Sequence, residues 1–117
     1  MNKRELGSSY EEQAATFLRT RGMKILHRNF RCYLGEIDLV AQDEDTLVFV
    51  EVKYRFSDRY GWGEAHVNKK KQQTIYRVAE VYLNSYSRDR IPPCRFDVVA
   101  FDGDRVRYFP NAFERSF

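Results

Sequence analysis

Little in the sequence would cross-link the chain or anchor it to a membrane. The 117 residues include two cysteines, Cys32 and Cys94, and neither lies in a CxxC pair or at a Cys/His ligand spacing. Two cysteines cannot build the scaffold of a disulfide-rich secreted protein, so a reducing compartment is expected. No apolar run approaches the ~20 residues that span a bilayer, and the first residues lack the apolar segment of a signal peptide. We therefore expect a cytoplasmic protein that makes no contact with membranes.

The short motifs of several large enzyme classes are also missing. The sequence contains no Walker loop, GxGxxG, HExxH or GxSxG. Nucleotide kinases, dinucleotide-dependent dehydrogenases, zincins and the common serine hydrolases therefore have no support. Internal repeats, low-complexity segments and linkers are absent too, and 117 residues suit one hydrophobic core. We predict a single domain that spans residues 1–117.

Neither sign of charge dominates the total, but the charges are unevenly placed. Twenty Lys and Arg against 17 Asp and Glu give a net charge of +3, which excludes a polybasic arm. Residues 1–35 carry +4, residues 36–53 carry −5, residues 54–90 carry +4, and residues 91–117 are neutral. An acidic block between two basic ones suits an anionic polymer held by basic flanks around a cation-binding centre. Charge alone favours the simpler explanation, which is solvated charge scattered over the surface.

Two helices are predicted from capping residues and apolar periodicity. The first is expected from about Ser9 to Arg21, because Ser8 and Ser9 are each followed three residues later by a glutamate, as in a capping box. Gly22 is a typical stop after such a helix. Asn68 is expected to cap the second helix, whose apolar residues recur every three or four positions.

Five strands surround these helices in the predicted order α-β-β-β-α-β-β. A first strand is followed by two hairpins, one before and one after the second helix. In the first hairpin we expect Gln42 to pair with Leu47 around a polar loop. The predicted strands are residues 23–32, 36–41, 47–53, 96–101 and 106–109, with a loop at 43–46. This order predicts an α/β fold in which a mixed β-sheet is flanked by two helices.

The first hairpin carries four charged residues at facing positions. If residues 43–46 form its loop, counting back from the loop places Asp38 opposite Glu51. Two positions further along, Glu36 lies opposite Lys53. Directly opposed residues have Cβ atoms roughly 5 Å apart, so the two carboxylates would repel each other.

A cation would relieve this repulsion. Paired carboxylate oxygens suit Mg²⁺ or Mn²⁺, which keep several waters and also bind phosphate oxygens. Lys53, two residues after Glu51, would hold or activate a water or stabilise charge that develops on a phosphate. A solvent-facing strand with a Glu36–Lys53 ion pair explains the same residues, and the residues alone do not separate the two explanations.

A third acid points toward the same region. Glu11 lies four residues before Ala15, and hence on the buried stripe of the first helix. Capping of that helix together with Ser8 is its alternative role, and it does not exclude a role in the site. Asp97, by contrast, is expected to form a structural ion pair near a turn, with Arg95 or with another residue. The histidines, His27 and His66, are expected to be structural or surface residues.

Basic and aromatic side chains cluster after the hairpin. Three lysines open the second helix and oppose the positive end of its dipole, a cost that a bound anion would offset. The loop before them mixes arginines with aromatic rings, as surfaces that bind single strands do. An exposed basic turn and a core tryptophan are the alternative explanations. The candidate nucleic-acid-binding residues are Lys69, Lys70, Lys71, Arg55, Arg59 and Trp62.

Two motifs now carry a resemblance to a known group of enzymes. GEIDLV at residues 35–40, followed by FVEVK at 49–53, resembles the signature of the PD-(D/E)xK nucleases. More narrowly, nearly the whole chain resembles the YraN-like family of uncharacterised bacterial proteins, predicted to be endonuclease-like. The two motifs are specific in combination, although neither is specific alone. The resemblance implies a restriction-endonuclease-like core related to archaeal Holliday-junction resolvases.

The resemblance also implies roles by position. Asp38 and Glu51 would bind the metal, and Lys53 would assist the attacking water. Glu11 matches the helix acid that completes a resolvase-type site, and Lys71 matches a helix lysine placed near phosphate. A final match, with an accessory role left open, is Glu36 in the first motif. The chain departs from the family at Tyr54, where a small threonine is common, and this bears on substrate preference.

Together these features predict a metal-dependent DNA endonuclease that uses Mg²⁺ or Mn²⁺ and acts on branched or otherwise structured DNA. The alternative is a nucleic-acid-binding module with a vestigial nuclease site. A protein-interaction domain is the third hypothesis, favoured if DNA binding is absent and Trp62 lies in an apolar surface patch. Relatives that cut junctions act as dimers, so the resemblance leaves a homodimer open.

Overall fold

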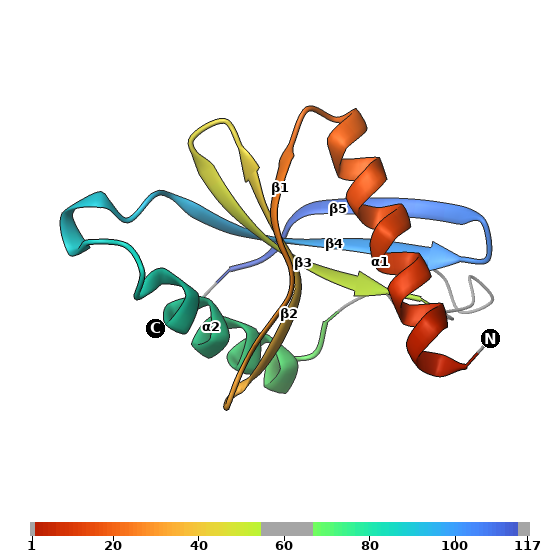
Figure 1. Ribbon diagram of the computed structural model, residues 1–117, viewed down its shortest axis with the longest axis horizontal. Helices are drawn as coiled ribbons and strands as arrows, with labels where there is room; N and C mark the ends of the chain where they lie inside the picture. The colour runs from red at the N-terminus through yellow and green to blue at the C-terminus, as the bar shows by residue number, and fades with distance from the viewer. Residues whose placement is uncertain (1, 55–66, 115–117) are drawn as a thin grey trace.

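A computed structural model describes residues 2–54 and 67–114, which form a five-stranded sheet and two long helices (Figure 1). The order α-β-β-β-α-β-β and the α/β fold with a mixed sheet are therefore confirmed. The elements are α1 (Lys3–Thr20), β1 (Lys24–Cys32), β2 (Gly35–Asp43), β3 (Thr46–Lys53), α2 (Lys69–Leu83), the 3-10 helix η3 (Arg88–Arg90), β4 (Cys94–Asp102) and β5 (Arg105–Phe113).

The strands lie in the sheet in the order in which they occur in the chain, β1-β2-β3-β4-β5. All neighbours are antiparallel except β3 and β4, which are parallel. Parallel neighbours need a crossover connection, and α2 lies within the segment that connects β3 to β4. Neither α1 nor α2, in the described part of the chain, is long and apolar enough to cross a membrane.

The two helices cover opposite faces of the sheet. On one face, Ala14, Ala15 and Leu18 of α1 are fully buried against alternate residues of β2 and β3. On the other face, α2 buries an apolar stripe that includes Val78 and Tyr82. Apolar burial on both faces is the principal stabilising term of such a layered fold. The predicted spacing of apolar residues in the second helix is confirmed by this packing.

The beginning of the first helix was predicted wrongly. The helix begins at Lys3, six residues before Ser9, and the side chain of Asn2 accepts a hydrogen bond of 2.9 Å from the backbone N–H of Glu5. Ser8 and Ser9 therefore lie inside the helix, and the capping box does not form. The two serines suggested a helix start because they match a capping box. The packing of α1 against the sheet overrides this local signal. A Cβ on Gly7 would lie 3.1 Å from the hydroxyl of Tyr54, so glycine admits that ring.

The last strand, predicted as residues 106–109, extends further, to Phe113, because its pairing with β4 continues to that residue. The cap of α2, the stop after α1 and the register of the first hairpin agree with the structure. The side chain of Asn68 caps α2 by accepting a 2.9 Å hydrogen bond from the backbone N–H of Lys71. Gly22 has a φ of 89°, in the left-handed region that suits a residue after a helix. In the first hairpin Gln42 pairs with Leu47, as expected.

A buried ionic cluster joins β4 to β5. Asp97 is 0% exposed and forms an ion pair with Arg95 at 3.2 Å, as predicted. It also accepts hydrogen bonds from the hydroxyl of Tyr108 and, at 2.8 Å, from the backbone N–H of Asn111. Arg95 makes a second ion pair, with Asp43 at 2.9 Å. The carboxylate of Asp97 is therefore satisfied on several sides and acts as a structural brace.

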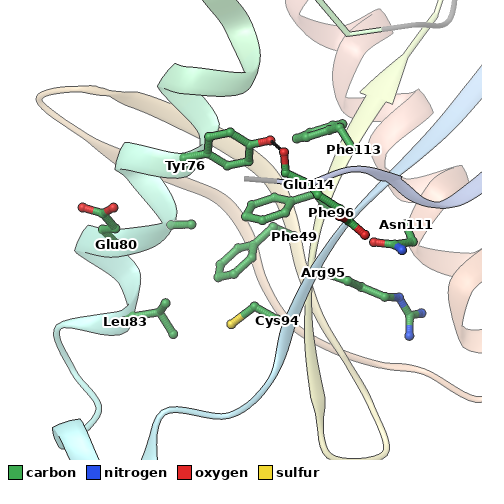
Figure 2. Close-up of a pocket in the computed structure, with 11 residues that line it drawn as sticks. Phe49, Tyr76, Glu80, Leu83, Cys94, Arg95, Phe96, Asn111, Phe113 and Glu114 are labelled. Atoms are coloured by element: carbon green, nitrogen blue, oxygen red, sulfur yellow. Dashed lines mark hydrogen bonds between the residues drawn. The ribbon is translucent and has the colours of Figure 1, made fainter. Parts of the chain in front are cut away.

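A cavity of about 240 Å³ lies between α2 and the sheet (Figure 2). Aromatic rings line it, among them Phe49, Tyr76 and Phe96, and the Tyr76 hydroxyl donates a hydrogen bond to the carbonyl of Glu114. The charged residues of the first hairpin do not belong to its lining. This cavity is part of the apolar packing on the α2 face and is separate from the candidate site.

Candidate functional site

The candidate site lies where β2 and β3 separate. Their backbone ladder runs from the loop as far as Leu39 and Val50, so the cross-strand pair expected between Asp38 and Glu51 does not form in the described ladder. Instead, Oδ2 of Asp38 accepts a 2.8 Å hydrogen bond from the backbone N–H of Val52. The side chain thus replaces a backbone acceptor at the end of the ladder. The register prediction is confirmed as far as Leu39 and Val50, where the described ladder ends.

The separation of the strands still leaves the two carboxyl groups in contact. The side chains of Asp38 and Glu51 lie within hydrogen-bonding reach of each other. Burial and, second, the charge of Glu51 raise the pKa of Asp38 to about 8, although the hydrogen bond from Val52 acts in the opposite direction. Burial also raises the pKa of Glu51. The pair is therefore a partly buried site of crowded negative charge, which a cation would stabilise.

Two lysines act on this pair from different elements. Lys71, in the first turn of α2, has the largest opposing effect on the pKa of Glu51, and Lys53 at the end of β3 also lowers it. Leu47 and Phe49 of β3 pack on the α2 side, so strand alternation directs Glu51 and Lys53 to that side too. The structure therefore brings Lys71 and Lys53 to the carboxyl pair.

Glu11 approaches the pair from α1, on the other side. Its Oε2 accepts a 2.8 Å hydrogen bond from Nδ2 of Asn29 in β1, and its charge contributes to the raised pKa of Asp38. In the β1–β2 register Arg28 pairs with Leu39 and Phe30 with Ile37, which leaves Asn29 at the level of Asp38. Asn29 has a φ of 54°, in the left-handed region that asparagine tolerates better than most residues. Sequence reasoning missed this residue, and a polar asparagine inside an alternating strand was the only signal for it.

Glu36 lies next to the site but has a partner of its own. It forms an ion pair with Nε of Arg31 at 2.9 Å, across the β1–β2 hairpin. The Glu36–Lys53 ion pair, the alternative explanation of the hairpin charges, is thus replaced by a pair within the neighbouring hairpin. The negative charge of Glu36 still acts on the site, because it raises the pKa of both Asp38 and Glu51.

The glycine of the first motif has a packing role. Gly35 has a φ of 149°, where side chains are disfavoured, and a Cβ there would lie 2.8 Å from Cγ2 of Thr74 in α2. A residue without a side chain lets α2 approach the start of β2 closely. The same glycine thus brings the amino-terminal half of α2, with Lys71, toward the β2 residues that follow.

The carboxyl pair has the donor set of a hard divalent cation. In the described residues no group of three or more His, Cys, Asp and Glu side chains is gathered closely enough to hold a metal. Two carboxylates nevertheless suffice for Mg²⁺, which keeps several waters and is commonly held by one or two carboxylates plus phosphate oxygens. The pair of Asp38 and Glu51 therefore fits such an ion, with Glu11 outside the immediate ligand set.

Among the remaining predicted residues, the structure describes two lysines and one histidine. Lys69 and Lys70 are exposed on the first turn of α2, beside Lys71. Arg55, Arg59 and Trp62 lie outside the described residues, as does His66. His27 is exposed, and its Nδ1 lies 3.0 Å from the hydroxyl of Tyr82, in agreement with a structural role.

Comparison with known proteins gives a match along most of the chain. Residues 10–101 match the family model described as the uncharacterised protein family UPF0102. A UPF0102 protein of Janthinobacterium sp. (strain Marseille) is 44% identical over 112 residues, which cover 96% of this chain and 89% of that protein. One from Caldicellulosiruptor saccharolyticus is 50% identical over 101 residues, which cover 85% of this chain and 83% of that protein. Another, from Lachnoclostridium phytofermentans, is 44% identical over 114 residues, 97% of each chain.

Proposed function

We propose that this chain, which belongs to the uncharacterised protein family UPF0102, is a metal-dependent DNA endonuclease. The observation that carries the proposal is the contact between Asp38 and Glu51 at the point where β2 and β3 separate. Two partly buried acids in contact are costly unless a cation binds them or they share a proton. Lysines on the α2 side supply the positive charge that a phosphodiester needs.

Each residue has a separable task in this proposal. Asp38 and Glu51 would hold Mg²⁺ or Mn²⁺, which when bound polarises a phosphate oxygen and lowers the pKa of a coordinated water. Lys53, directly after the acidic pair, would orient the attacking water or stabilise the charge that develops on the phosphoryl group. Lys71 would contact a phosphate oxygen at the first turn of α2, where the helix dipole also favours an anion.

The hydrogen bond from the backbone N–H of Val52 helps to position Asp38 for the proposed cation. A backbone donor fixes Oδ2 of Asp38, so the other oxygen is the one directed to a partner. Without a cation, the raised pKa of each carboxyl group favours a proton held between Asp38 and Glu51. Cation binding needs the deprotonated carboxylate and therefore releases this proton.

The test is cleavage of DNA by the purified full-length protein. Branched, flapped and single-stranded oligonucleotides are incubated with Mg²⁺ or Mn²⁺, and products are resolved on denaturing gels. We expect cleavage that requires the metal and is lost in Asp38→Asn and Glu51→Gln. Asp45→Asn, a matched change of an exposed acid in the β2–β3 turn, should cleave as the wild type does.

Two outcomes would reject the nuclease. Cleavage that persists in both variants would come from a contaminant or from another site. Salt-dependent DNA binding without metal-dependent cleavage of any substrate would identify the alternative function, a nucleic-acid-binding module with a vestigial site.

A further inference from the structure

We propose that the DNA strand leaves the carboxyl pair along a groove beside the first turns of α1, where Lys3 and Arg4 contact its phosphates. This inference rests on the proposed function and extends it to residues outside both sequence motifs. Sequence reasoning placed all the nucleic-acid contacts in the second basic block, on or before α2. The groove adds a contact surface on the α1 side of the site.

The groove is lined by residues that neighbour the candidate site. It measures about 660 Å³ and runs between the amino-terminal half of α1 and the β1–β2 hairpin, with Tyr54 in its wall. Glu11, Asn29 and Glu36 also line it. Asn29 lies at the level of Asp38 in the β1–β2 register, and Glu36 precedes Asp38 by two residues in β2. A strand with its phosphate at the carboxyl pair can therefore extend into this groove.

The acidic side chains of the groove have partners within the protein, whereas the outermost basic side chains pair with no acid among the described residues. Glu11 accepts from Asn29, Glu36 pairs with Arg31, and the Glu5 side chain lies 3.4 Å from the amide of Asn2. Lys3 and Arg4 are exposed and, among the residues that the structure describes, pair with no acid. Their charges are thus available to an external anion.

Both helices place cations in their first turn at this site. α1 begins with Lys3 and Arg4, followed by the acid Glu5, whereas α2 begins with three lysines and has no acid in its first turn. Cations in a first turn oppose the helix dipole, so each helix gains if an anion binds there. Lys71 of α2 acts on Glu51, and the basic first turn of α1 lines the same groove as Glu11, about two helical turns further along α1.

The span of the groove indicates a polymer rather than a single phosphate. Eight residues separate Lys3 from Glu11, and this corresponds to about 12 Å of helix at 1.5 Å per residue. One phosphate group cannot contact both ends of such a length. Arg4, Ser8 and Glu11 lie on one helix face, at spacings of four and three, and form a continuous wall. A phosphodiester strand fits this extended, polar surface.

The experiment measures binding separately from cleavage. Ca²⁺ replaces Mg²⁺ because it takes the same oxygen ligands, and the Kd of a labelled single-stranded oligonucleotide is measured by fluorescence anisotropy over a range of NaCl concentrations. The double variant Lys3→Gln/Arg4→Gln is compared with Arg88→Gln/Arg90→Gln, which removes the same charge from exposed residues of η3. Thermal unfolding verifies folding, and loss of the first-turn cations should not weaken α1.

We expect the slope of log Kd against log salt to fall by roughly 0.7 for each lost phosphate contact in Lys3→Gln/Arg4→Gln, and to stay unchanged in the η3 variant. If both variants bind like the wild type while Asp38-dependent cleavage is observed, the groove assignment is wrong and the proposed function stands. If the wild-type protein neither binds nor cleaves DNA, both proposals fall. If the η3 variant weakens binding equally, the effect is one of net charge, and the groove is again rejected.

Discussion

Asn29 and Glu11 connect β1 to α1 by a hydrogen bond of 2.8 Å from Nδ2 to Oε2, at the level of Asp38 in the sheet. The left-handed backbone at Asn29 lies within an otherwise extended strand. A conformation that costs free energy persists only where the surroundings maintain it, and it is common where a side chain must be aimed. Here the aimed side chain is the amide that holds Glu11.

Replacement of this asparagine by glycine should loosen Glu11 without disturbing the backbone. Glycine adopts a φ of 54° readily, so Asn29→Gly removes the amide alone. Loss of a group that orients a metal ligand typically lowers metal affinity about 10–100-fold. Because Glu11 lies outside the immediate ligand set, we expect a measurable loss below this range when Mn²⁺ binding is measured by electron paramagnetic resonance titration.

The matched control is Asn111→Gly, a change of another asparagine in the left-handed region, with a φ of 50°. Asn111 interacts with Asp97 through its backbone N–H, which glycine keeps. Equal Mn²⁺ affinity in the two variants and the wild type would contradict a role for Asn29 at the site.

The carboxyl pair should make the metal-free protein less stable as the pH rises. Asp38 has a pKa of about 8 in the folded state against an ordinary value of 3.8, so between these limits the folded state holds more protons than the unfolded one. The free energy of unfolding therefore falls as pH rises through this window, by at most about 1.4 kcal/mol per pH unit for one proton. The raised pKa of Glu51 acts in the same direction.

Urea unfolding between pH 5 and pH 8 measures this dependence. Asp38→Asn keeps an acceptor for the backbone N–H of Val52 but cannot ionise, so the fall in stability should be much smaller. Mg²⁺ should stabilise the wild type more at pH 8 than at pH 5, because it binds the deprotonated pair. An unchanged pH dependence in Asp38→Asn, compared with Asp45→Asn, would disprove the assignment.

Truncation of Asp97 should lower the free energy of unfolding strongly. Its effect on the chemistry of the candidate site should be much smaller. Asp97→Ala leaves the guanidinium of Arg95 without its buried partner and removes the acceptor for the Tyr108 hydroxyl. Breaking a buried ion pair typically costs about 3–5 kcal/mol. Equilibrium urea unfolding should show a loss of this size, whereas Asp104→Ala, in the exposed β4–β5 turn, should show almost none. Near-equal stability of the two variants would mean that the ionic cluster is not a brace.

Gly35→Ala should be destabilising for two separable reasons. The backbone strain at a φ of 149° adds to a Cβ contact of 2.8 Å with Thr74. Gly103→Ala is the matched control, since its φ of 62° is also unfavourable but nothing lies within 4 Å of the added Cβ. We expect Gly35→Ala to cost more than the roughly 1–3 kcal/mol of backbone strain alone.

A second substitution separates the two terms for Gly35. Thr74→Ser removes Cγ2 but keeps the hydroxyl, which donates to the carbonyl of Lys70. The double variant should recover the steric part of the loss, as measured by urea unfolding, and keep the strain. No recovery would show that close approach of α2 is not what requires this glycine.

Local chemistry allowed much of the fold to be predicted. The apolar stripe of α2, its cap at Asn68 and the Gln42–Leu47 pair follow from periodicity, capping and turn residues, which act over a few positions. The start of α1 could not be found in this way. The reason for Gly7 is the ring of Tyr54, 47 positions away, and no local rule contains that contact.

In the candidate site, too, local sequence patterns predict some features and long-range contacts decide the others. The sequence by itself determined that two acids and a lysine lie on neighbouring strands, because a side-chain period of two leaves few registers that bury the apolar residues. Only the tertiary structure decided how the acids meet. There Asp38 leaves the ladder to bind the N–H of Val52, and Asn29 and Lys71 arrive from β1 and α2. These contacts depend on strand separation and helix packing, which arise from long-range burial and are not encoded in any short segment.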